Sequence, residues 1–325
     1  MRGLVWALAV ALLVSASAAA ESDDCAKIKG FAIGLNPTED GYLMPLGVAR
    51  TPRQFLLDLG AAYTKMDEAI AVSLNFPTKS LPYGLHVQDS GGRFTKIAVV
   101  PTLEIGPITR KDVEVLIGAH RNGWGPAADG VAAINIFYGL DIELDLAHNR
   151  LGLYLPRDNC AFAPFWPAVE WGSGDFMTAP TGGMYTPMNL DGAQLIVTFN
   201  TTEGRTYMPF DAAHRLFRIE ENDHRLVPVG ARASDGKAVY RFPFTSLSGG
   251  HNVTVQDPEI YIVKGETSCG GTRDLNNWKW GEASTYCFGG GDLQLGINLL
   301  KKLHFFFSFK DKKVYFTLAE PPAAK

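Results

Sequence analysis

Asp58 is the residue of this chain that is best placed to do chemistry. Three apolar residues, Phe55, Leu56 and Leu57, run directly into it, and Gly60 follows shortly after. A carboxylate at the end of a buried strand is costly unless it is hydrogen-bonded or used, and a glycine lets backbone amides approach it closely. The pattern therefore predicts a strand that ends by presenting one acid in a tight turn.

A second acid, Asp211, follows the apolar run Tyr207–Phe210. Two carboxyl groups a few ångströms apart share one proton, because like charges at that distance cannot both ionise. One group then acts as a base toward water while the other donates a proton to a carbonyl oxygen. Asp211 is equally placed to begin a short helix through Phe217, so both roles are open for it.

An internal repeat indicates which elements must position these acids. Residues 133–137 (AINIF) recur as residues 296–300 (GINLL), and each copy is followed at matched spacing by a final strand, at 151–154 and 314–317. A long unit that occurs twice indicates two related lobes, because a solenoid needs three or more short units. The 34 glycines and 19 prolines fit lobes made of short strands and turns.

The segment Leu56–Ala61 resembles the catalytic turn of the aspartic proteases, in which an apolar pair precedes D-[TS]-G-[AS]. The endings of both lobes are similar to those of bacterial retropepsin-like proteins with two lobes fused in one chain. The resemblance implies an all-β fold of two retropepsin-like β-barrel lobes with a cleft between them. It also implies Asp58 and Asp211 as the catalytic pair and Gly60 as a substrate-binding residue.

The sequence departs from the family motif in both turns. Leu59 stands where the family has Thr or Ser, and Ala212 and Ala213 replace both the hydroxyl residue and the glycine. Ala133 also replaces a family glycine that Gly296 keeps. Losing hydrogen bonds across the lobe junction costs about a few kcal/mol of local preorganisation, enough to slow a reaction by orders of magnitude.

Two functions are therefore open. The first is an exported aspartic endopeptidase that hydrolyses peptide bonds with a water activated between two aspartates. The second is a catalytically inactive homologue that binds peptides or a partner protein in the cleft.

A β-hairpin is predicted around the glycine-rich turn 89–92. The resemblance implies that this hairpin forms a flap over the substrate, and an ordinary surface hairpin is the alternative. The flap interpretation adds Tyr83, Gly84, Gly91 and Gly92 to the substrate-binding residues.

Residues 1–20 have the features of a secretory signal peptide, with Arg2, the apolar run Leu4–Val14, and small residues before Glu21. The apolar run is shorter than the roughly 20 residues of a spanning helix, so the sequence predicts a periplasmic or secreted protein without stable membrane insertion after signal removal; a retained N-terminal anchor is the alternative. Disulfides persist in such compartments, and four cysteines allow three pairings. The lobes that the resemblance implies favour the pairs Cys25–Cys160 and Cys269–Cys287.

The expected organisation is a signal peptide at 1–20, an N-terminal lobe at 21–160, a connector at 161–183 and a C-terminal lobe at 184–320. A net charge of −4 leaves no basic surface for nucleic acid. No C-x-x-C or H-E-x-x-H motif occurs, so neither a metal nor a cofactor is expected. Because both lobes lie in one chain, we expect a monomer with a peptide or protein as its substrate.

Overall fold

The computed structural model describes residues 29–320, apart from 83–86, 90–91, 120–123, 157–164, 167, 169, 179–182, 233–234, 251 and 266–290. The predicted signal peptide, all four cysteines, Tyr83, Gly84 and Gly91 lie outside the described residues. The structure therefore does not test the predictions made for these residues.

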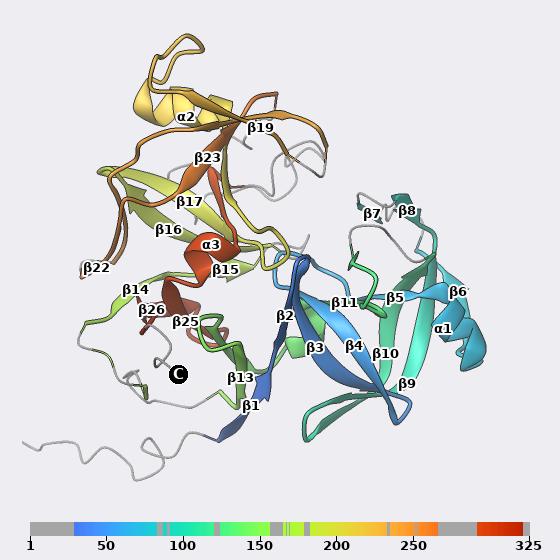
Figure 1. The fold of residues 1–325 in the computed structure, drawn as a ribbon. Helices are drawn as coiled ribbons and strands as arrows, with labels where there is room; N and C mark the ends of the chain where they lie inside the picture. Colours follow the sequence, from blue (N-terminus) through green and yellow to red (C-terminus); the bar gives the residue numbers. More distant parts are fainter. Residues whose placement is uncertain are drawn as a thin grey trace, which may run out of the picture.

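A six-stranded sheet joins two β-rich lobes (Figure 1). Its strand order is β1-β13-β12-β25-β26-β14, so three strands come from each half of the chain and the seam lies between β12 and β25. β14 lies within the stretch that the sequence predicts as the connector. The strands are β1 (Gly30–Gly34), β12 (Asp141–Asp145), β13 (Arg150–Tyr154), β14 (Gly172–Asp175), β25 (Leu303–Ser308) and β26 (Lys313–Leu318).

The N-terminal lobe is an eight-stranded sheet in which β3 also pairs with β9, closing the strands between them into a barrel. The hairpin predicted near residues 89–92 is present as β7 and β8. The strands are β2 (Asn36–Thr38), β3 (Gly41–Val48), β4 (Thr51–Asp58), β5 (Lys65–Asp67), β6 (Thr78–Ser80), β7 (Val87–Asp89), β8 (Gly92–Phe94), β9 (Lys96–Ile105), β10 (Ile108–Gly118) and β11 (Gly130–Ala133). The helical segments are α1 (Glu68–Ser73) and the 3₁₀ turn η2 (Ile134–Phe137).

The C-terminal lobe is a ten-stranded sheet that repeats the central pairings of the first lobe. β17 runs parallel to β24 as β4 runs parallel to β11, and β18 runs parallel to β23 as β5 runs parallel to β10. The strands are β15 (Met177–Thr178), β16 (Met184–Leu190), β17 (Ala193–Phe199), β18 (Thr206–Pro209), β19 (Val227–Ala231), β20 (Ala238–Arg241), β21 (Ser246–Gly249), β22 (Val253–Gln256), β23 (Ile260–Val263) and β24 (Leu293–Leu295). The helices are α2 (Phe210–Phe217) and α3 (Ile297–Leu300).

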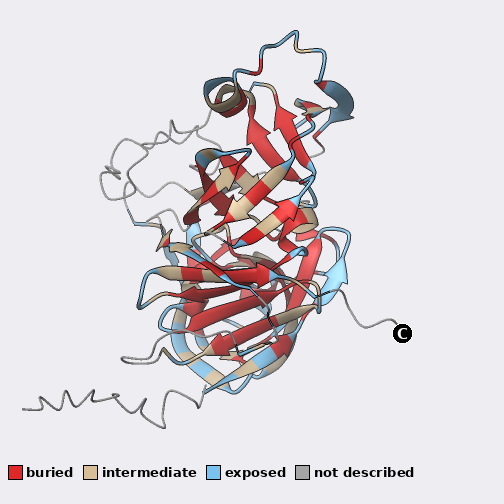
Figure 2. Cartoon of the chain, turned by 90° about the vertical axis from the view of Figure 1, so that its left-hand side faces the viewer, coloured by how far each residue is buried: buried red, intermediate tan, exposed pale blue. Residues whose placement is uncertain are grey.

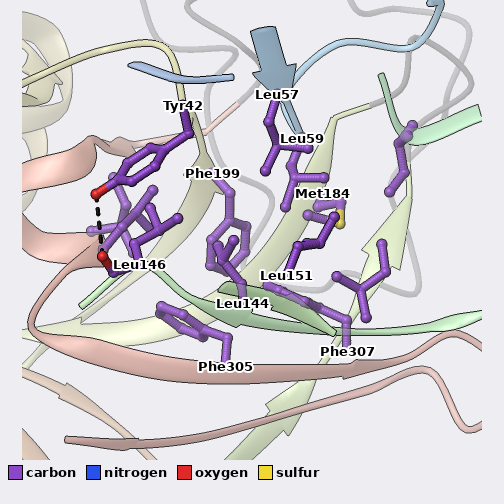
Figure 3. Packing of buried hydrophobic residues seen from close by; sticks show 14 of the residues in the cluster. Tyr42, Leu57, Leu59, Leu144, Leu146, Leu151, Met184, Phe199, Phe305 and Phe307 are labelled. Atoms are coloured by element: carbon purple, nitrogen blue, oxygen red, sulfur yellow. Dashed lines mark hydrogen bonds between the residues drawn. The ribbon is translucent and has the colours of Figure 1, made fainter. Parts of the chain in front are cut away.

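One hydrophobic cluster extends through both lobes and one face of the shared sheet. Figure 3 shows Leu57 and Leu59 of the first lobe packing toward Met184 and Phe199 of the second, above Phe305 of the shared sheet. The four inner strands of the shared sheet and the centres of both lobes are mainly buried, whereas its edge strands β1 and β14 and the connecting turns are more exposed (Figure 2). The two predicted lobes are confirmed, and they share a continuous core.

Among the residues that the structure describes, no helix has the length and apolar character required to cross a membrane.

Candidate functional site at the lobe junction

Asp58 ends β4 in a tight turn, as the sequence predicts. The backbone N–H of Gly60 donates a hydrogen bond to Asp58 Oδ1 at 2.9 Å, and the N–H of Ala61 donates to the Asp58 carbonyl oxygen at 3.3 Å. Burial raises the pKa of Asp58, because it removes the water that would stabilise the charge. The positive charge of Lys65 and the amides of Gly60 and Ala61 act in the opposite direction without cancelling this effect.

The second lobe has an equivalent turn, and it carries an amide in place of the acid. β4 pairs with β11 so that Asp58 lies opposite Ala133, and β17 pairs with β24 so that Phe199 lies opposite Leu295. Gly296, which follows Leu295, corresponds to Ala133 in the internal repeat. Asn200, the residue after Phe199, therefore occupies the position of Asp58. The local hydrogen bond is also the same, because the N–H of Thr202 donates to Asn200 Oδ1 at 2.9 Å.

The network beneath the two turns repeats as well. In the first lobe, Thr64 Oγ1 donates to Asn135 Oδ1 at 2.8 Å and accepts from the N–H of Ala133 at 3.1 Å. In the second lobe, Thr206 Oγ1 donates to Asn298 Oδ1 at 2.7 Å and accepts from the N–H of Gly296 at 3.0 Å. The replacement of glycine by Ala133 has therefore left this network intact.

Thr201 connects the two turns. Its Oγ1 donates to the Leu57 carbonyl oxygen at 2.6 Å and accepts from the N–H of Leu59 at 3.2 Å. Thr201 and Leu59 are fully buried. The sequence predicted that hydroxyls are missing from both turns, but the structure places a hydroxyl in the second turn and an apolar Leu59 in the first. The side-chain hydroxyl that bonds across the junction therefore comes from the second turn.

The turns lie against each other closely enough to require a glycine. A Cβ atom on Gly60 would lie 2.8 Å from the Phe199 carbonyl oxygen and 3.9 Å from the Asn200 Cα. The Asp58 and Asn200 turns are therefore neighbours across the lobe junction.

Asp211 lies elsewhere. It is in the first turn of α2, which packs on β18 and β23 and lies at the end of the second lobe remote from β4 (Figure 1). The helix that the sequence left open for this segment is present, and it follows β18 as α1 follows β5 in the first lobe. Asp211 thus does not occupy the turn that faces Asp58, and the catalytic role predicted for it has no support from this placement.

Of the other predicted substrate-binding residues, Gly92 lies in β8 of the hairpin, and Gly60 lies at the junction. Phe94, at the end of β8, belongs to an apolar cluster that also contains Leu56 and Trp124. The Phe94 and Trp124 rings are stacked with centroids 6.5 Å apart. Leu56 stands two residues before Asp58 on β4, so the base of the hairpin shares an apolar cluster with the strand that delivers the acid.

A spacing signal in the sequence would have identified Asn200. Thr64 stands six residues after Asp58, and Thr206 stands six residues after Asn200. A search for a second acid overlooks this position, because Asn200 is not an acid.

The chain has a two-lobed acid-protease fold. One carboxylate, that of Asp58, and one carboxamide, that of Asn200, stand at the junction of its lobes. Residues 44–131 match the aspartyl protease family model, a region that runs from β3 into β11 and contains the Asp58 turn. No curated protein matches the sequence significantly.

Among solved structures, the aspartic proteinase from Irpex lacteus is similar in fold, with a TM-score of 0.50 and 11% sequence identity over 91% of this chain and 99% of that chain. The family match therefore covers part of the first lobe, and the fold of the whole chain is similar to that of a two-lobed aspartic proteinase.

Proposed function

We propose that this chain is a non-catalytic aspartic-protease homologue that binds an extended peptide or protein segment beside the junction of its lobes. The observation that carries this proposal is Asn200 in the position equivalent to Asp58. A carboxamide does not ionise and cannot share a proton with a neighbouring carboxyl group. The acid–base pair that this fold uses to activate water is therefore incomplete.

The binding role is supported by what the junction has kept. The Asp58 and Asn200 turns have the same hydrogen-bonded geometry, and Thr201 still joins them. The β7–β8 hairpin packs through Phe94 on the apolar cluster beside Asp58. Such a surface offers apolar contacts and a hairpin edge to an extended chain without requiring chemistry.

The endopeptidase remains the second candidate, and the environment of Asp58 favours it. Burial raises the pKa of this carboxyl group, as is typical of acids that work as proton donors. A single acid would then have to activate water and protonate the leaving group in turn.

Incubation of the chain with an unfolded protein substrate from acidic to neutral pH separates the two candidates. We expect no cleavage, and we expect saturable binding of fluorescent peptides by anisotropy that persists in Asp58→Asn. Asp211→Asn is the matched control, because α2 lies away from the junction. Cleavage that Asp58→Asn abolishes and Asp211→Asn leaves intact would establish the endopeptidase instead. Absence of both cleavage and peptide binding would refute the proposed function.

A further inference from the structure

The outer face of the shared sheet carries a buried cluster of ionisable side chains that the proposed function does not use. Alternate residues of β12, Glu143 and Asp145, point to this face, whereas Ile142 and Leu144 point into the core. His304 of β25 lies on the same face, across the seam between the lobes. The side chains of Glu143, Asp145 and His304 are only 0%, 3% and 6% exposed.

We propose that Glu143, Asp145 and His304 form a binding site for a divalent transition-metal ion of the Zn²⁺ class. One nitrogen or oxygen atom of each residue lies within 4.8 Å of the others. His304 Nε2 is 2.8 Å from Glu143 Oε1, and His304 Nδ1 is 4.0 Å from Asp145 Oδ2. A histidine gives only one ring nitrogen to an ion, and donor atoms around zinc are about 3 to 4 Å apart, so side-chain movements would have to draw the three donor atoms, now within 4.8 Å of one another, closer together.

The chemistry of the donors selects this class of ion. One imidazole and two carboxylates form a mixed nitrogen and oxygen set, which suits Zn²⁺ and its neighbours better than Ca²⁺ or Mg²⁺, which prefer oxygen donors alone.

The balance of charge also favours a cation. Arg150 is the permanently charged partner of the two buried carboxylates, contacting Glu143 and lying 3.6 Å from Asp145. One arginine supplies a single positive charge beside two buried carboxyl groups, and a bound cation would add a second. Arg150 is 39% exposed, and its buried Nε–H makes no hydrogen bond among the described residues.

The cluster is covered by an aromatic ring and borders a pocket. Trp166 stacks on the His304 ring with centroids 4.0 Å apart and an interplanar angle of 17°, which holds the imidazole in place. A pocket of about 350 Å³ leads to the cluster and is lined by Asp145, His148, Arg150, Trp166, His304, Leu318 and Glu320. His148 Nδ1, 2.9 Å from Asp145, fixes the orientation of this carboxylate from the rim. An ion can therefore approach Asp145 and His304 through this pocket, behind which Glu143 is buried.

A metal at this position would join the lobes. Glu143 and Asp145 come from the N-terminal half of the chain and His304 from the C-terminal half, and Glu143 and His304 are 161 residues apart in sequence. Because β12 and β25 form the seam, binding would stabilise the pairing of the two halves. It would thereby raise the midpoint of unfolding by mass action.

The test is titration of the EDTA-treated chain with Zn²⁺, followed by calorimetry and thermal unfolding, with Mg²⁺ as the comparison ion. We expect one saturable Zn²⁺ site, an increase in Tm, and at least about tenfold weaker binding in His304→Gln and in Glu143→Gln. His214→Gln is the matched control, since this histidine pairs with Glu220 far from the seam.

Circular dichroism shows whether each variant is folded, and Asp145→Asn replaces any variant that is not. Titration with Co²⁺ adds a visible absorption band that reports nitrogen and oxygen ligands. Absence of saturable Zn²⁺ binding, or Zn²⁺ binding that is equally tight in the folded His304→Gln and Asp145→Asn chains, would overturn the proposal.

Discussion

At the scale of single residues, the difference between Asp58 and Asn200 decides what the junction can do. Both side chains accept a hydrogen bond from the backbone N–H two residues later, both at 2.9 Å. The geometry is thus preserved while the proton chemistry is not, because only one of the two groups titrates. A structural role explains this pattern without requiring catalysis, since an Asx-type turn needs only the oxygen.

The raised pKa of Asp58 predicts that the free energy of unfolding depends on pH. The folded chain holds the proton on Asp58 more tightly than the unfolded chain, whose carboxyl has its ordinary pKa of 3.8. Folding stability from this group is therefore complete below pH 3.8 and is lost as pH rises through the higher folded pKa. Asp58→Asn, which resembles the protonated acid, should remove this loss. Each unit by which the two pKa values differ is worth about 1.4 kcal/mol at neutral pH.

Urea unfolding of both chains between pH 3 and pH 8 measures the effect. We expect the two chains to be similar in stability at the acidic end and the variant to be the more stable at neutral pH. A wild-type curve that stays parallel to that of Asp58→Asn across the range would contradict the assignment of a raised pKa.

Asp58, Asn200 and Asp211 show which parts of the site could be predicted from the sequence and which could not. Asp58 was predictable because an apolar strand that ends in an acid and a glycine has few structural explanations. Asn200 was overlooked, because an asparagine after a strand is common in turns and the search was for an acid. The pairing of β17 with β24, together with the threonine six residues later, reveals its equivalence to Asp58. Asp211 follows an apolar strand just as Asp58 does, but here the chain continues directly into α2.

At the scale of elements, the junction depends on one hydroxyl. Thr201 Oγ1 bonds to the Leu57 carbonyl and to the Leu59 N–H, both inside the core. Replacing Thr201 with valine keeps the shape of the side chain but leaves these backbone groups buried without a partner. Each unsatisfied group costs about 1–3 kcal/mol.

We therefore expect Thr201→Val to lower the free energy of unfolding by about 2 kcal/mol or more, measured by urea denaturation. Thr201→Ser should retain most of the stability because it keeps the hydroxyl. Thr202→Val is the matched control, since Thr202 Oγ1 donates its hydrogen bond within its own turn, to Asn200 Oδ1. An equal loss in Thr202→Val and Thr201→Val would show that the bridge to Leu57 does not matter.

Strands were the most predictable elements, and the hairpin and both lobe endings are where the sequence places them. The ionisable face of the shared sheet was not predicted. Glu143 and Asp145 have the period of two that places them on one face of a strand, but their partner His304 is brought to them only by the β12–β25 pairing. Such long-range pairings are set by the packing of the whole fold rather than by local pattern.

At the scale of the whole molecule, the two lobes are not independent units. Phe199 of the second lobe packs edge-to-face on Phe305 and Phe307 of the shared sheet, with ring centroids 5.2 and 5.0 Å apart. The same cluster includes Leu57 and Leu59 beneath the Asp58 turn. Because apolar burial is the main favourable term in folding, a core that continues through both lobes couples their stability.

Phe307→Ala tests this coupling, since the Phe307 ring is fully buried and belongs to the continuous cluster that both lobes share. The truncation should lower the free energy of unfolding by about 3–5 kcal/mol, because it removes apolar contacts and leaves a cavity. If one core holds both lobes, the remaining structure should still unfold in a single transition, with far-UV circular dichroism and tryptophan fluorescence following the same curve. Leu318→Ala is the control, as that side chain is 52% exposed and should change stability little. Two separate transitions in the wild-type chain would mean that the lobes fold independently, and the junction at Asp58 and Asn200 would then be a contact between units rather than part of one core.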